Sequence, residues 1–213
     1  MLPVTIVDDF LDQPDEWREY ALGCEYFKSV GRWPGFRTKP LAEINKVMHN
    51  RFMIRLLSLF LEPKDNDLMF EAKGTFQKIS PGTGEGWVHR DNQVATAIVY
   101  LNPDADLNAG TSLFRPKKNN IWSMMYDNVR KENYRGNISA EEAEPYRLEY
   151  NSQFEETVRI NNVYNRLVVF EGGIHHAANV LQSNGDDRLT LVFFIDALYS
   201  RSTLFPLTRL KCF

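Results

Sequence analysis

The residues of this sequence with the clearest potential for chemistry are three of its four histidines, which fall in two short clusters. His89 stands in WVHRDN with Asp91 two positions later, and His175 and His176 stand in GGIHHAAN. In extended backbone, side chains two residues apart leave the same face, so His89 and Asp91 can bind one metal ion together. An imidazole, a carboxylate and one later imidazole form a 2-His-1-carboxylate facial triad, which leaves coordination positions open on Fe(II).

A His-x-Asp pair alone is a weak signal, because histidine and aspartate also form structural hydrogen bonds. The order of the downstream residues strengthens the metal hypothesis: a strand pattern ending in Tyr100, a Gly-Thr turn, a strand leading to the histidine pair, and Arg188 opening an apolar strand. Neighbours in extended chain point to opposite faces, so only one of His175 and His176 can reach the shared metal. The remaining histidine, His49, is expected at the surface or in a helix cap.

The elements expected to position these residues begin with two N-terminal helices. Aromatic and apolar residues recur every three to four positions over residues 12–27, which predicts a helix with one face in the core. The same period over residues 41–61, followed by Pro63, predicts a second helix. Between them lies GRWPGFRTKP, a segment rich in turn residues.

Beyond residue 67 the pattern changes to short β-like runs separated by Gly, Asn, Asp and Pro. Strands are predicted at 68–79, 94–101, 111–114, 157–160, 166–170 and 189–198. We expect an α+β fold with one domain over residues 1–213, in which residues 1–67 give helical support and residues 68–198 form a β-sandwich or jelly roll. Residues 116–156 are polar and are interpreted as an irregular insertion with one short helix near 139–144, where Ser139 and Glu142 form a capping-box pattern.

The bulk composition narrows the partners and the compartment. With 25 basic and 28 acidic residues and a formal charge of -3, the chain has no global electrostatic reason to bind nucleic acid or an anionic membrane. Its only cysteines, Cys24 and Cys212, suggest no disulfide framework, and we expect a reducing, cytoplasmic setting. The N-terminus lacks the basic start of a signal peptide, and no apolar run is long enough to span a bilayer. The pattern does not indicate an oligomeric state.

Four blocks resemble the 2-oxoglutarate/Fe(II)-dependent dioxygenase superfamily, particularly its prolyl-hydroxylase-like branch. They are SPGTGEGWVHRDN, TAIVYLNPDADLNAGTSLF, NRLVVFEGGIHHAANV and RLTLVFFI, which run from residue 80 to residue 195 with 116–156 unmatched. The resemblance implies a double-stranded β-helix core in which His89, Asp91 and His176 bind iron. His176 is the implied second histidine ligand because eleven residues separate it from Arg188, close to the family's usual loop between these two positions. It further implies that Tyr100 hydrogen-bonds 2-oxoglutarate and that Arg188 pairs with the remote carboxylate of this co-substrate.

By the same resemblance, the chain is expected to use Fe(II), 2-oxoglutarate and O2 to hydroxylate a C–H bond of an amino-acid residue or small metabolite, with release of succinate and CO2. The sequence departs from close prolyl hydroxylases at Ser80, where they have Tyr before Pro-Gly, so one substrate or co-substrate contact is missing or relocated. The roles of Trp33, Arg37 and Trp87 stay open between a substrate entrance and ordinary aromatic packing.

The sequence leaves two alternatives to this function open. A cupin-type metalloenzyme has the same β architecture without 2-oxoglutarate, but it would need no Arg188 and typically uses more histidine ligands. A catalytically inert β-sandwich binding module would bind metal without turnover. The predicted partners are a small-molecule or peptide substrate, with no nucleic acid and no membrane.

Overall fold

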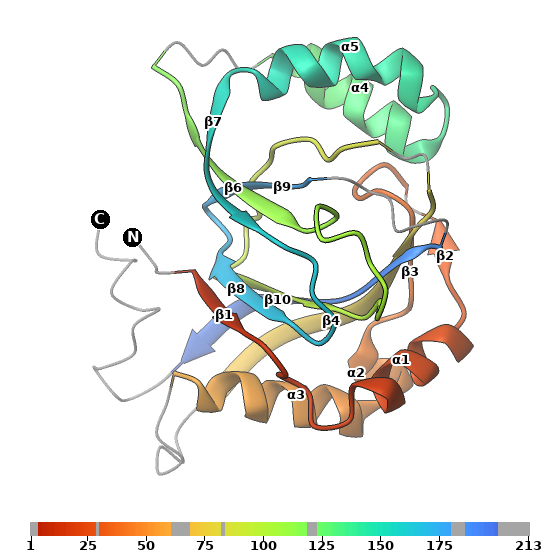
Figure 1. Cartoon of the computed structure of the whole chain (residues 1–213), viewed down its shortest axis with the longest axis vertical. Coiled ribbons are helices and arrows are strands. Elements are labelled where there is room, and N and C mark those ends of the chain that lie inside the picture. Colours follow the sequence, from red (N-terminus) through yellow and green to blue (C-terminus); the bar gives the residue numbers. More distant parts are fainter. Residues whose placement is uncertain are drawn as a thin grey trace.

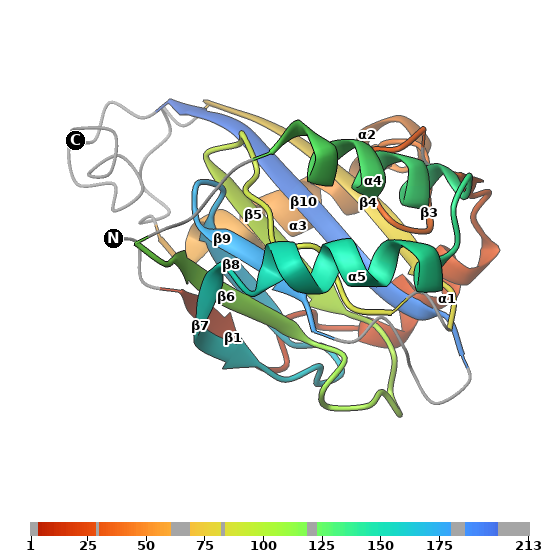
Figure 2. The same cartoon turned by 90° about the horizontal axis from the view of Figure 1, so that it is seen from above.

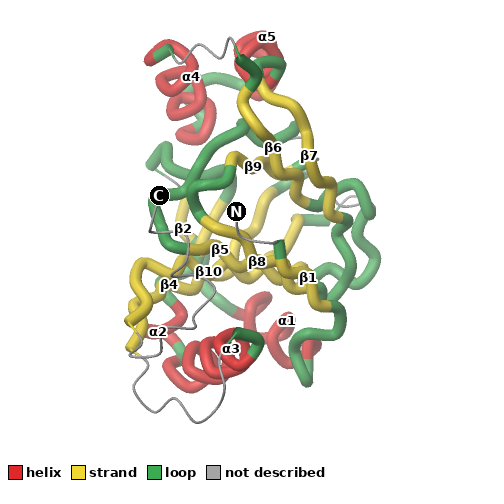
Figure 3. Tube along the Cα trace, turned by 90° about the vertical axis from the view of Figure 1, so that its left-hand side faces the viewer, coloured by secondary structure: helices red, strands yellow, loops and turns green. Residues whose placement is uncertain are grey.

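The computed structural model describes residues 4–28, 30–60, 69–81, 84–118, 123–179 and 186–199. Cys212, Pro63 and the predicted boundary between residues 67 and 68 lie outside these residues. Four layers follow one another through the molecule (Figures 1 and 3): a group of N-terminal helices, a large sheet, a small sheet and a second pair of helices. The two sheets face each other, and the chemistry-bearing residues of the sequence come from their facing sides.

The N-terminal layer consists of α1 (Pro14–Gly23), α2 (Leu41–Ile44) and α3 (Lys46–Ser58). The helix predicted at 12–27 is shorter than expected, because the chain becomes extended at Cys24 and enters a short strand. The helix predicted at 41–61 is divided at Asn45, whose side chain accepts a hydrogen bond from the Met48 backbone nitrogen at 3.0 Å and so caps α3. These helices cover one face of the large sheet.

Within the described residues, the large sheet has seven antiparallel strands in the order β1-β8-β5-β10-β4-β3-β2. Their bounds are β1 (Thr5–Val7), β2 (Phe27–Lys28), β3 (Phe36–Arg37), β4 (Met69–Ile79), β5 (Ala95–Tyr100), β8 (Leu167–Glu171) and β10 (Arg188–Tyr199). Because strand side chains alternate between faces, β10 contributes side chains to both faces of the large sheet. The helix-facing side chains of β10 are Leu189, Leu191, Phe193 and Ile195. Those facing the small sheet line a cavity and are Arg188, Thr190, Val192 and Phe194.

Aromatic stacking joins α3 to the large sheet. The rings of Phe52 and Phe193 are stacked, with centroids 3.9 Å apart and planes at 11°. Gly74 on the neighbouring strand makes room for this pair, because a Cβ at that position would lie 2.3 Å from the Phe193 ring. The main apolar core therefore sits between the helices and the large sheet, and the opposite face of the sheet is free to hold polar residues.

The small sheet has the order β7-β6-β9, with β6 (Thr111–Pro116), β7 (Phe154–Ile160) and β9 (His175–Ala178). The segment around His89 adds to its edge, because His89 and His176 exchange backbone hydrogen bonds of 3.0 and 2.8 Å. Two antiparallel sheets packed face to face in this way form the double-stranded β-helix that the sequence predicted. All six predicted strands are present, whereas β1, β2, β3 and β9 were not anticipated.

The region between β6 and β7 is more ordered than predicted. It holds two helices of 12 residues each, α4 (Met124–Arg135) and α5 (Ala140–Asn151), which lie side by side in Figure 2. The capping box of Ser139 and Glu142 is confirmed, although the helix that follows is longer than expected. Both helices pack on Trp87, which is 2% exposed, through Tyr126 and Ala143.

Helix α5 also fixes the segment that leads to His89. The Asn151 side chain donates to the Gly86 carbonyl at 2.9 Å and accepts from the Val88 nitrogen at 3.0 Å. Arg147, which is buried, forms a 2.8 Å ion pair with Glu85. The insertion thus helps to position the His-x-Asp segment.

Within the ranges that the structure describes, every helix is too short or too polar to cross a bilayer.

Candidate metal centre

The structure brings His89, Asp91 and His176 together. One potential ligand atom from each lies within 4.8 Å of the others. The His176 Nε2 atom is 3.5 Å from Asp91 Oδ2, and the His89 Nε2 atom is 3.8 Å from Asp91 Oδ1. Two imidazole nitrogens and one carboxylate at this spacing form a donor set that suits a divalent transition metal and leaves part of its coordination sphere open.

Backbone carbonyls orient both imidazole rings. His89 Nδ1 lies 2.8 Å from the Trp87 carbonyl oxygen, and His176 Nδ1 lies 2.9 Å from the Ile174 carbonyl oxygen. A carbonyl can only accept a hydrogen bond, so each Nδ1 must carry the proton. Each Nε2 therefore has a free lone pair that faces the carboxylate, which is the tautomer that a metal ligand needs.

Asp91 is held by both its backbone and its side chain. Its nitrogen donates to the Gly172 carbonyl at 2.8 Å, and the Thr96 hydroxyl donates to Asp91 Oδ2 at 2.6 Å. The first contact brings Gly172 close to the loop after Asp91, where a Cβ at Gly172 would lie 2.2 Å from the Gln93 carbonyl oxygen. Only glycine therefore fits at position 172 without moving this loop.

The neighbouring histidine points elsewhere. The His175 ring packs against Phe154, with centroids 4.9 Å apart, and lines an adjoining hollow that shares His89 and Arg130 with the cavity. His176 is 5% exposed and lies on the cavity side of the same strand. The alternation of β9 therefore separates the two side chains as expected for adjacent residues of a strand.

The electrostatic surroundings keep His89 neutral. Burial lowers the pKa of His89 well below its ordinary value, and the neighbouring His176 lowers it further, while Asp91 opposes the shift. A neutral imidazole is the form that binds a metal ion. At neutral pH, His89 can therefore bind a cation without first losing a proton.

Arg188 lies in the same cavity, 4% exposed, at the start of β10. Its Nε donates to the Ala109 carbonyl at 2.8 Å, and its guanidinium stands 5.4 Å from the centre of the Tyr100 ring. No carboxylate among the described residues forms an ion pair with it. Burial lowers the pKa of Arg188, while the adjacent Tyr100 acts in the opposite sense.

Tyr100 is fully buried beneath Arg188, and its hydroxyl donates to Thr111 Oγ1 at 2.9 Å. Burial raises the pKa of this tyrosine, so the phenol stays protonated. Tyr100 packs with Leu113, Ile160 and other apolar residues. Its ring supports Arg188, and it is Thr111, the residue that accepts from Tyr100, that lines the cavity.

The cavity between the two sheets has a volume of about 530 Å³. It is lined by all three members of the triad, by Arg188, and by Trp33, Arg37 and Trp87, whose roles the sequence left open. Sequence reasoning did not single out Thr96 or Thr111, nor Arg130 and Tyr134 on α4. The alternating pattern of β5 could have indicated Thr96, because it predicts which face each residue takes, but no sequence signal places α4 above the cavity.

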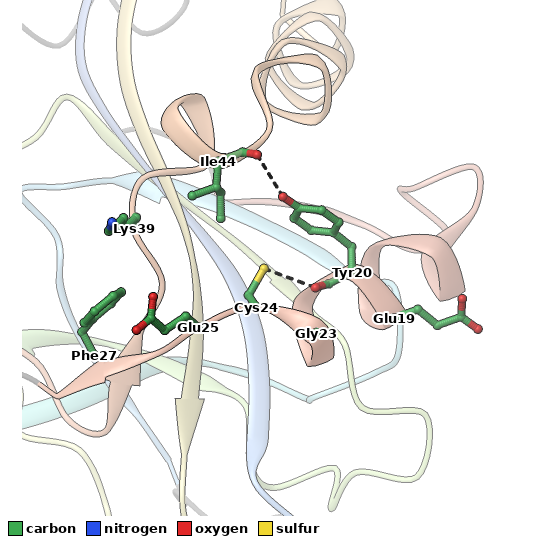
Figure 4. A pocket seen from close by; sticks show the side chains of 8 residues that line it. All are labelled: Glu19, Tyr20, Gly23, Cys24, Glu25, Phe27, Lys39 and Ile44. Atoms are coloured by element: carbon green, nitrogen blue, oxygen red, sulfur yellow. Dashed lines mark hydrogen bonds between the residues drawn. The ribbon is translucent and has the colours of Figure 1, made fainter.

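A second hollow of about 390 Å³ lies between the end of α1 and the segment leading to α2 (Figure 4). At its wall, the Cys24 thiol donates to the Tyr20 carbonyl at 3.2 Å, and the Tyr20 hydroxyl donates to the Ile44 carbonyl at 3.1 Å. None of the predicted metal or co-substrate residues lines it. The chemistry of the molecule is therefore centred on the cavity between the sheets.

The fold is that of the 2-oxoglutarate/Fe(II)-dependent oxygenases, including the prolyl hydroxylases. A prolyl hydroxylase from Trichoplax adhaerens, solved with a peptide of hypoxia inducible factor, is 14% identical with a TM-score of 0.55, over 91% of this chain and 83% of that one. HygX from Streptomyces hygroscopicus, solved with nickel, 2-oxoglutarate and hygromycin B, is 14% identical with a TM-score of 0.56, over 94% and 83%. The epimerase SnoN, with Fe3+, alpha ketoglutarate and nogalamycin RO, is 14% identical with a TM-score of 0.54, over 94% and 82%.

Sequence similarity assigns the chain more narrowly. The chain belongs to the family described as "Family of unknown function (DUF6445)", which it matches over residues 1–195. Among curated proteins, none matches the chain in sequence. The fold and the family are therefore defined, and the reaction must be argued from the site.

Proposed function

We propose that this chain is an Fe(II)- and 2-oxoglutarate-dependent dioxygenase that hydroxylates a C–H bond of an amino-acid residue or small metabolite and releases succinate and CO2. The observation that carries the proposal is one cavity that contains both a preformed His-Asp-His triad and a buried arginine without an acidic partner among the described residues. The first suits a metal with open positions, and the second suits the dicarboxylate that such a metal would share.

In this proposal His89, Asp91 and His176 are the three iron ligands. When bound, Fe(II) and 2-oxoglutarate supply the oxidising chemistry, in which one oxygen atom of O2 goes to succinate and the other to the hydroxylated product. The protein contributes geometry and exclusion of water. The Trp87 and Ile174 carbonyls hold the imidazoles in the ligand tautomer, and Thr96 holds the carboxylate.

Arg188 would bind the remote carboxylate of 2-oxoglutarate. A planar guanidinium matches a carboxylate with two parallel hydrogen bonds, and a buried cation needs such a partner because desolvation is costly. Tyr100 would act on the co-substrate through its neighbours, since its ring lies beneath Arg188 and its hydroxyl orients Thr111. This arrangement supports the proposal over a cupin-type enzyme, which has no use for a buried arginine at this position.

The substrate is proposed to be a small molecule or one residue of a peptide. A volume of about 530 Å³ lies in the ordinary range of small-molecule sites, and here it must also accommodate the co-substrate. Among proteins of similar fold, one was solved with a peptide and another with hygromycin B, so the architecture accepts either kind of ligand.

The decisive test is an anaerobic titration of the metal-free protein with Fe(II) and then with 2-oxoglutarate, followed by visible absorption. Chelation of Fe(II) by 2-oxoglutarate gives a metal-to-ligand charge-transfer band, so the proposal predicts this band at one equivalent of each. Admission of O2 should then produce succinate. Metal uptake without the band would favour the cupin-type alternative, and the band without succinate would favour an inert binding module.

A further inference from the structure

A second arginine, Arg37 on β3, lines the cavity, and no ion pair with a described carboxylate balances its charge. Its guanidinium carbon lies 4.7 Å from the centre of the Trp33 ring and 5.1 Å from that of Phe194. Its Nη2 donates to Gln77 Oε1 at 3.2 Å, and Gln77 is fixed in turn by donating to the Pro34 carbonyl at 2.8 Å. Two aromatic rings and an amide thus hold the guanidinium in one orientation.

The side chain of Arg37 is partly buried in the cavity wall, and its charge has no counterpart in the part of the chain that the structure describes. Among the described residues no carboxylate forms an ion pair with it, and its Nε, which is inaccessible to solvent, has no hydrogen-bond partner. By contrast, the buried Arg147 pairs with both Glu85 and Glu144. Burial lowers the pKa of Arg37 to about 10, and the charge of Asp91 opposes this shift, so Arg37 stays cationic at neutral pH. A cation that is partly withdrawn from water and unpaired is destabilised, so an anion from outside the chain would satisfy it.

The backbone of Arg37 is level with Thr190 and Tyr100 through Gln77. Its side chain, however, extends away from the end of the cavity assigned to 2-oxoglutarate and contacts Phe194. Arg37 stacks on Phe194, which pairs with Thr96, the residue that holds the metal-binding carboxylate. Arg188 stacks on Tyr100, four residues further along β5 and therefore about 13 Å away along the strand. The two arginines therefore contact opposite ends of the cavity, and one dicarboxylate co-substrate held at Arg188 would leave Arg37 unneutralised.

The charge balance of the cavity also leaves the charge of Arg37 unneutralised. Its charged lining residues are Arg32, Arg37, Arg90, Arg130, Arg188 and Asp91. In the proposed complex, Fe(II) and Arg188 balance Asp91 and the 2-oxoglutarate dianion. Arg130 is paired with Asp127 at 2.5 Å, and Arg32 and Arg90 are exposed to solvent. Arg37 is left as a partly buried cation that neither the co-substrate nor a described carboxylate neutralises.

We propose that Arg37 anchors a substrate subsite and that the substrate presents an anionic group, a carboxylate or a phosphate, to its guanidinium. This inference rests on the proposed function, because it assigns to the substrate the end of the cavity that 2-oxoglutarate leaves open. The Phe194–Thr96 pair places the Arg37 end beside the metal-binding carboxylate, so the C–H bond to be hydroxylated lies within a few bonds of the anionic group. The substrate class is therefore a small organic acid or phosphate ester, or an acidic residue of a peptide.

The test is calorimetric titration of the anaerobic Fe(II)- and 2-oxoglutarate-loaded protein with three matched probes: benzoate, phenyl phosphate and the neutral benzamide. We expect one of the anions to bind at least about tenfold more tightly than benzamide, since a charge-assisted contact is lost with the neutral probe. Which anion binds better distinguishes a carboxylate substrate from a phosphate. In Arg37→Gln the preference should disappear, and in Arg37→Lys, which keeps the charge without the planar fork, it should be intermediate.

The matched control is Arg32→Gln, which removes an exposed arginine of the same cavity and should keep the preference. If Arg32→Gln lost the preference for anions as fully as Arg37→Gln, a general positive potential would explain the binding and the proposal would be overturned. Equal binding of the anions and benzamide, or no binding of any probe, would overturn it as well. The charge-transfer band, recorded on the same samples, reports the proposed function separately. If the band is absent, a loss of benzoate binding in Arg37→Gln that does not occur in Arg188→Gln still supports the subsite, and the reverse overturns it.

Discussion

Single hydrogen bonds decide which atoms of the triad are offered to a metal. The carbonyls of Trp87 and Ile174 select the imidazole tautomers, and Thr96 orients the carboxylate of Asp91. These contacts exist without any ion, so the side chains need little rearrangement to bind one. Predictions about individual residues follow from which of these contacts each substitution removes.

The two adjacent histidines provide a matched pair. We expect His176→Gln to lower bound Fe(II) from about one ion per chain to a small fraction, because a facial triad has no spare protein ligand. His175→Gln should retain the metal, since the His175 ring packs on Phe154 outside the cavity. Iron content after desalting, measured by atomic emission, decides the point. The opposite outcome would mean that the assigned register of β9 is wrong by one residue.

Replacing Arg188 tests the co-substrate contact. Arg188→Ala should keep the metal but raise the 2-oxoglutarate concentration for half-maximal charge-transfer absorbance on the order of 30-fold or more, as expected when one partner of a buried charged contact is lost. Arg166→Ala is a suitable control, because Arg166 forms its ion pair with Asp8 at the surface. An unchanged half-saturation in Arg188→Ala would show that the co-substrate is anchored elsewhere.

The depressed pKa of His89 predicts how the metal-free protein responds to acid. The unfolded chain binds a proton at His89 near the ordinary value of about 6.5, whereas the folded chain does so only at lower pH. Below about pH 6.5 the unfolded state therefore binds more protons, and the free energy of unfolding decreases as the pH falls towards the folded-state pKa. Urea unfolding of the metal-free protein between pH 7.5 and 5 should show this decrease, and His89→Gln should show a smaller one. Equal pH dependence in both proteins would contradict the assignment.

Neighbouring elements come close together where the loop after Asp91 crosses Gly172. A Cβ at this position would lie 2.2 Å from the Gln93 carbonyl oxygen, while one at Gly173 would meet only a Glu171 side-chain oxygen at 3.8 Å. We expect Gly172→Ala to cost about 1–3 kcal/mol of stability and to weaken metal binding, because the loop that carries Asp91 must shift. Gly173→Ala should change both by little. Thermal unfolding and Fe(II) titration of the two variants make the comparison, and equal behaviour would show that the loop adapts freely.

At the element level, sequence reasoning succeeded where a pattern was long enough to be periodic. All six predicted strands exist, and the capping box at Ser139 begins a helix. The strands that were missed are two to four residues long and are formed by pairing with a neighbour, which a local pattern cannot show. Helix α4 was missed because most of its surface is polar, and only Tyr126 is buried.

The expectation for His49 was wrong. It is 6% exposed, and its ring lies 5.4 Å from that of Phe193. Its position, three residues before Phe52 and four before Met53, would have placed it on the buried stripe of α3 if the helical period had been applied to polar residues as well. The triad was more accessible to prediction, because alternation in a strand fixes the side of His89 and Asp91. The partners of Arg37 were not, since they come from two separate strands and a turn.

In the molecule as a whole, the two faces of the large sheet have different roles: one face packs the main apolar core, and the other lines the cavity. The helix-facing side is apolar and contains the Phe52–Phe193 stack, and the cavity-facing side carries the proposed ligand-binding groups. We expect Phe52→Ala to destabilise the protein by about 3–5 kcal/mol and to lower its Tm by about 6–20 °C. Metal stoichiometry at 20 °C should be unchanged in the folded fraction, as calorimetry and iron content would show. Loss of metal in the folded variant would mean that the two faces are coupled.

The backbone pair between His89 and His176 has a consequence for how the protein would acquire the proposed metal ion. Because both imidazoles project from one antiparallel pair, their spacing is set by the sheet before any ion arrives. Such a rigid nitrogen and oxygen donor set follows the general affinity order, in which Co²⁺ and Ni²⁺ bind more tightly than Fe²⁺. We therefore expect freshly purified protein to carry whichever divalent ion was abundant during growth. If the site binds metal as proposed, the supply of metals in the cell, rather than selectivity built into the chain, would decide how much of the protein is in an iron form.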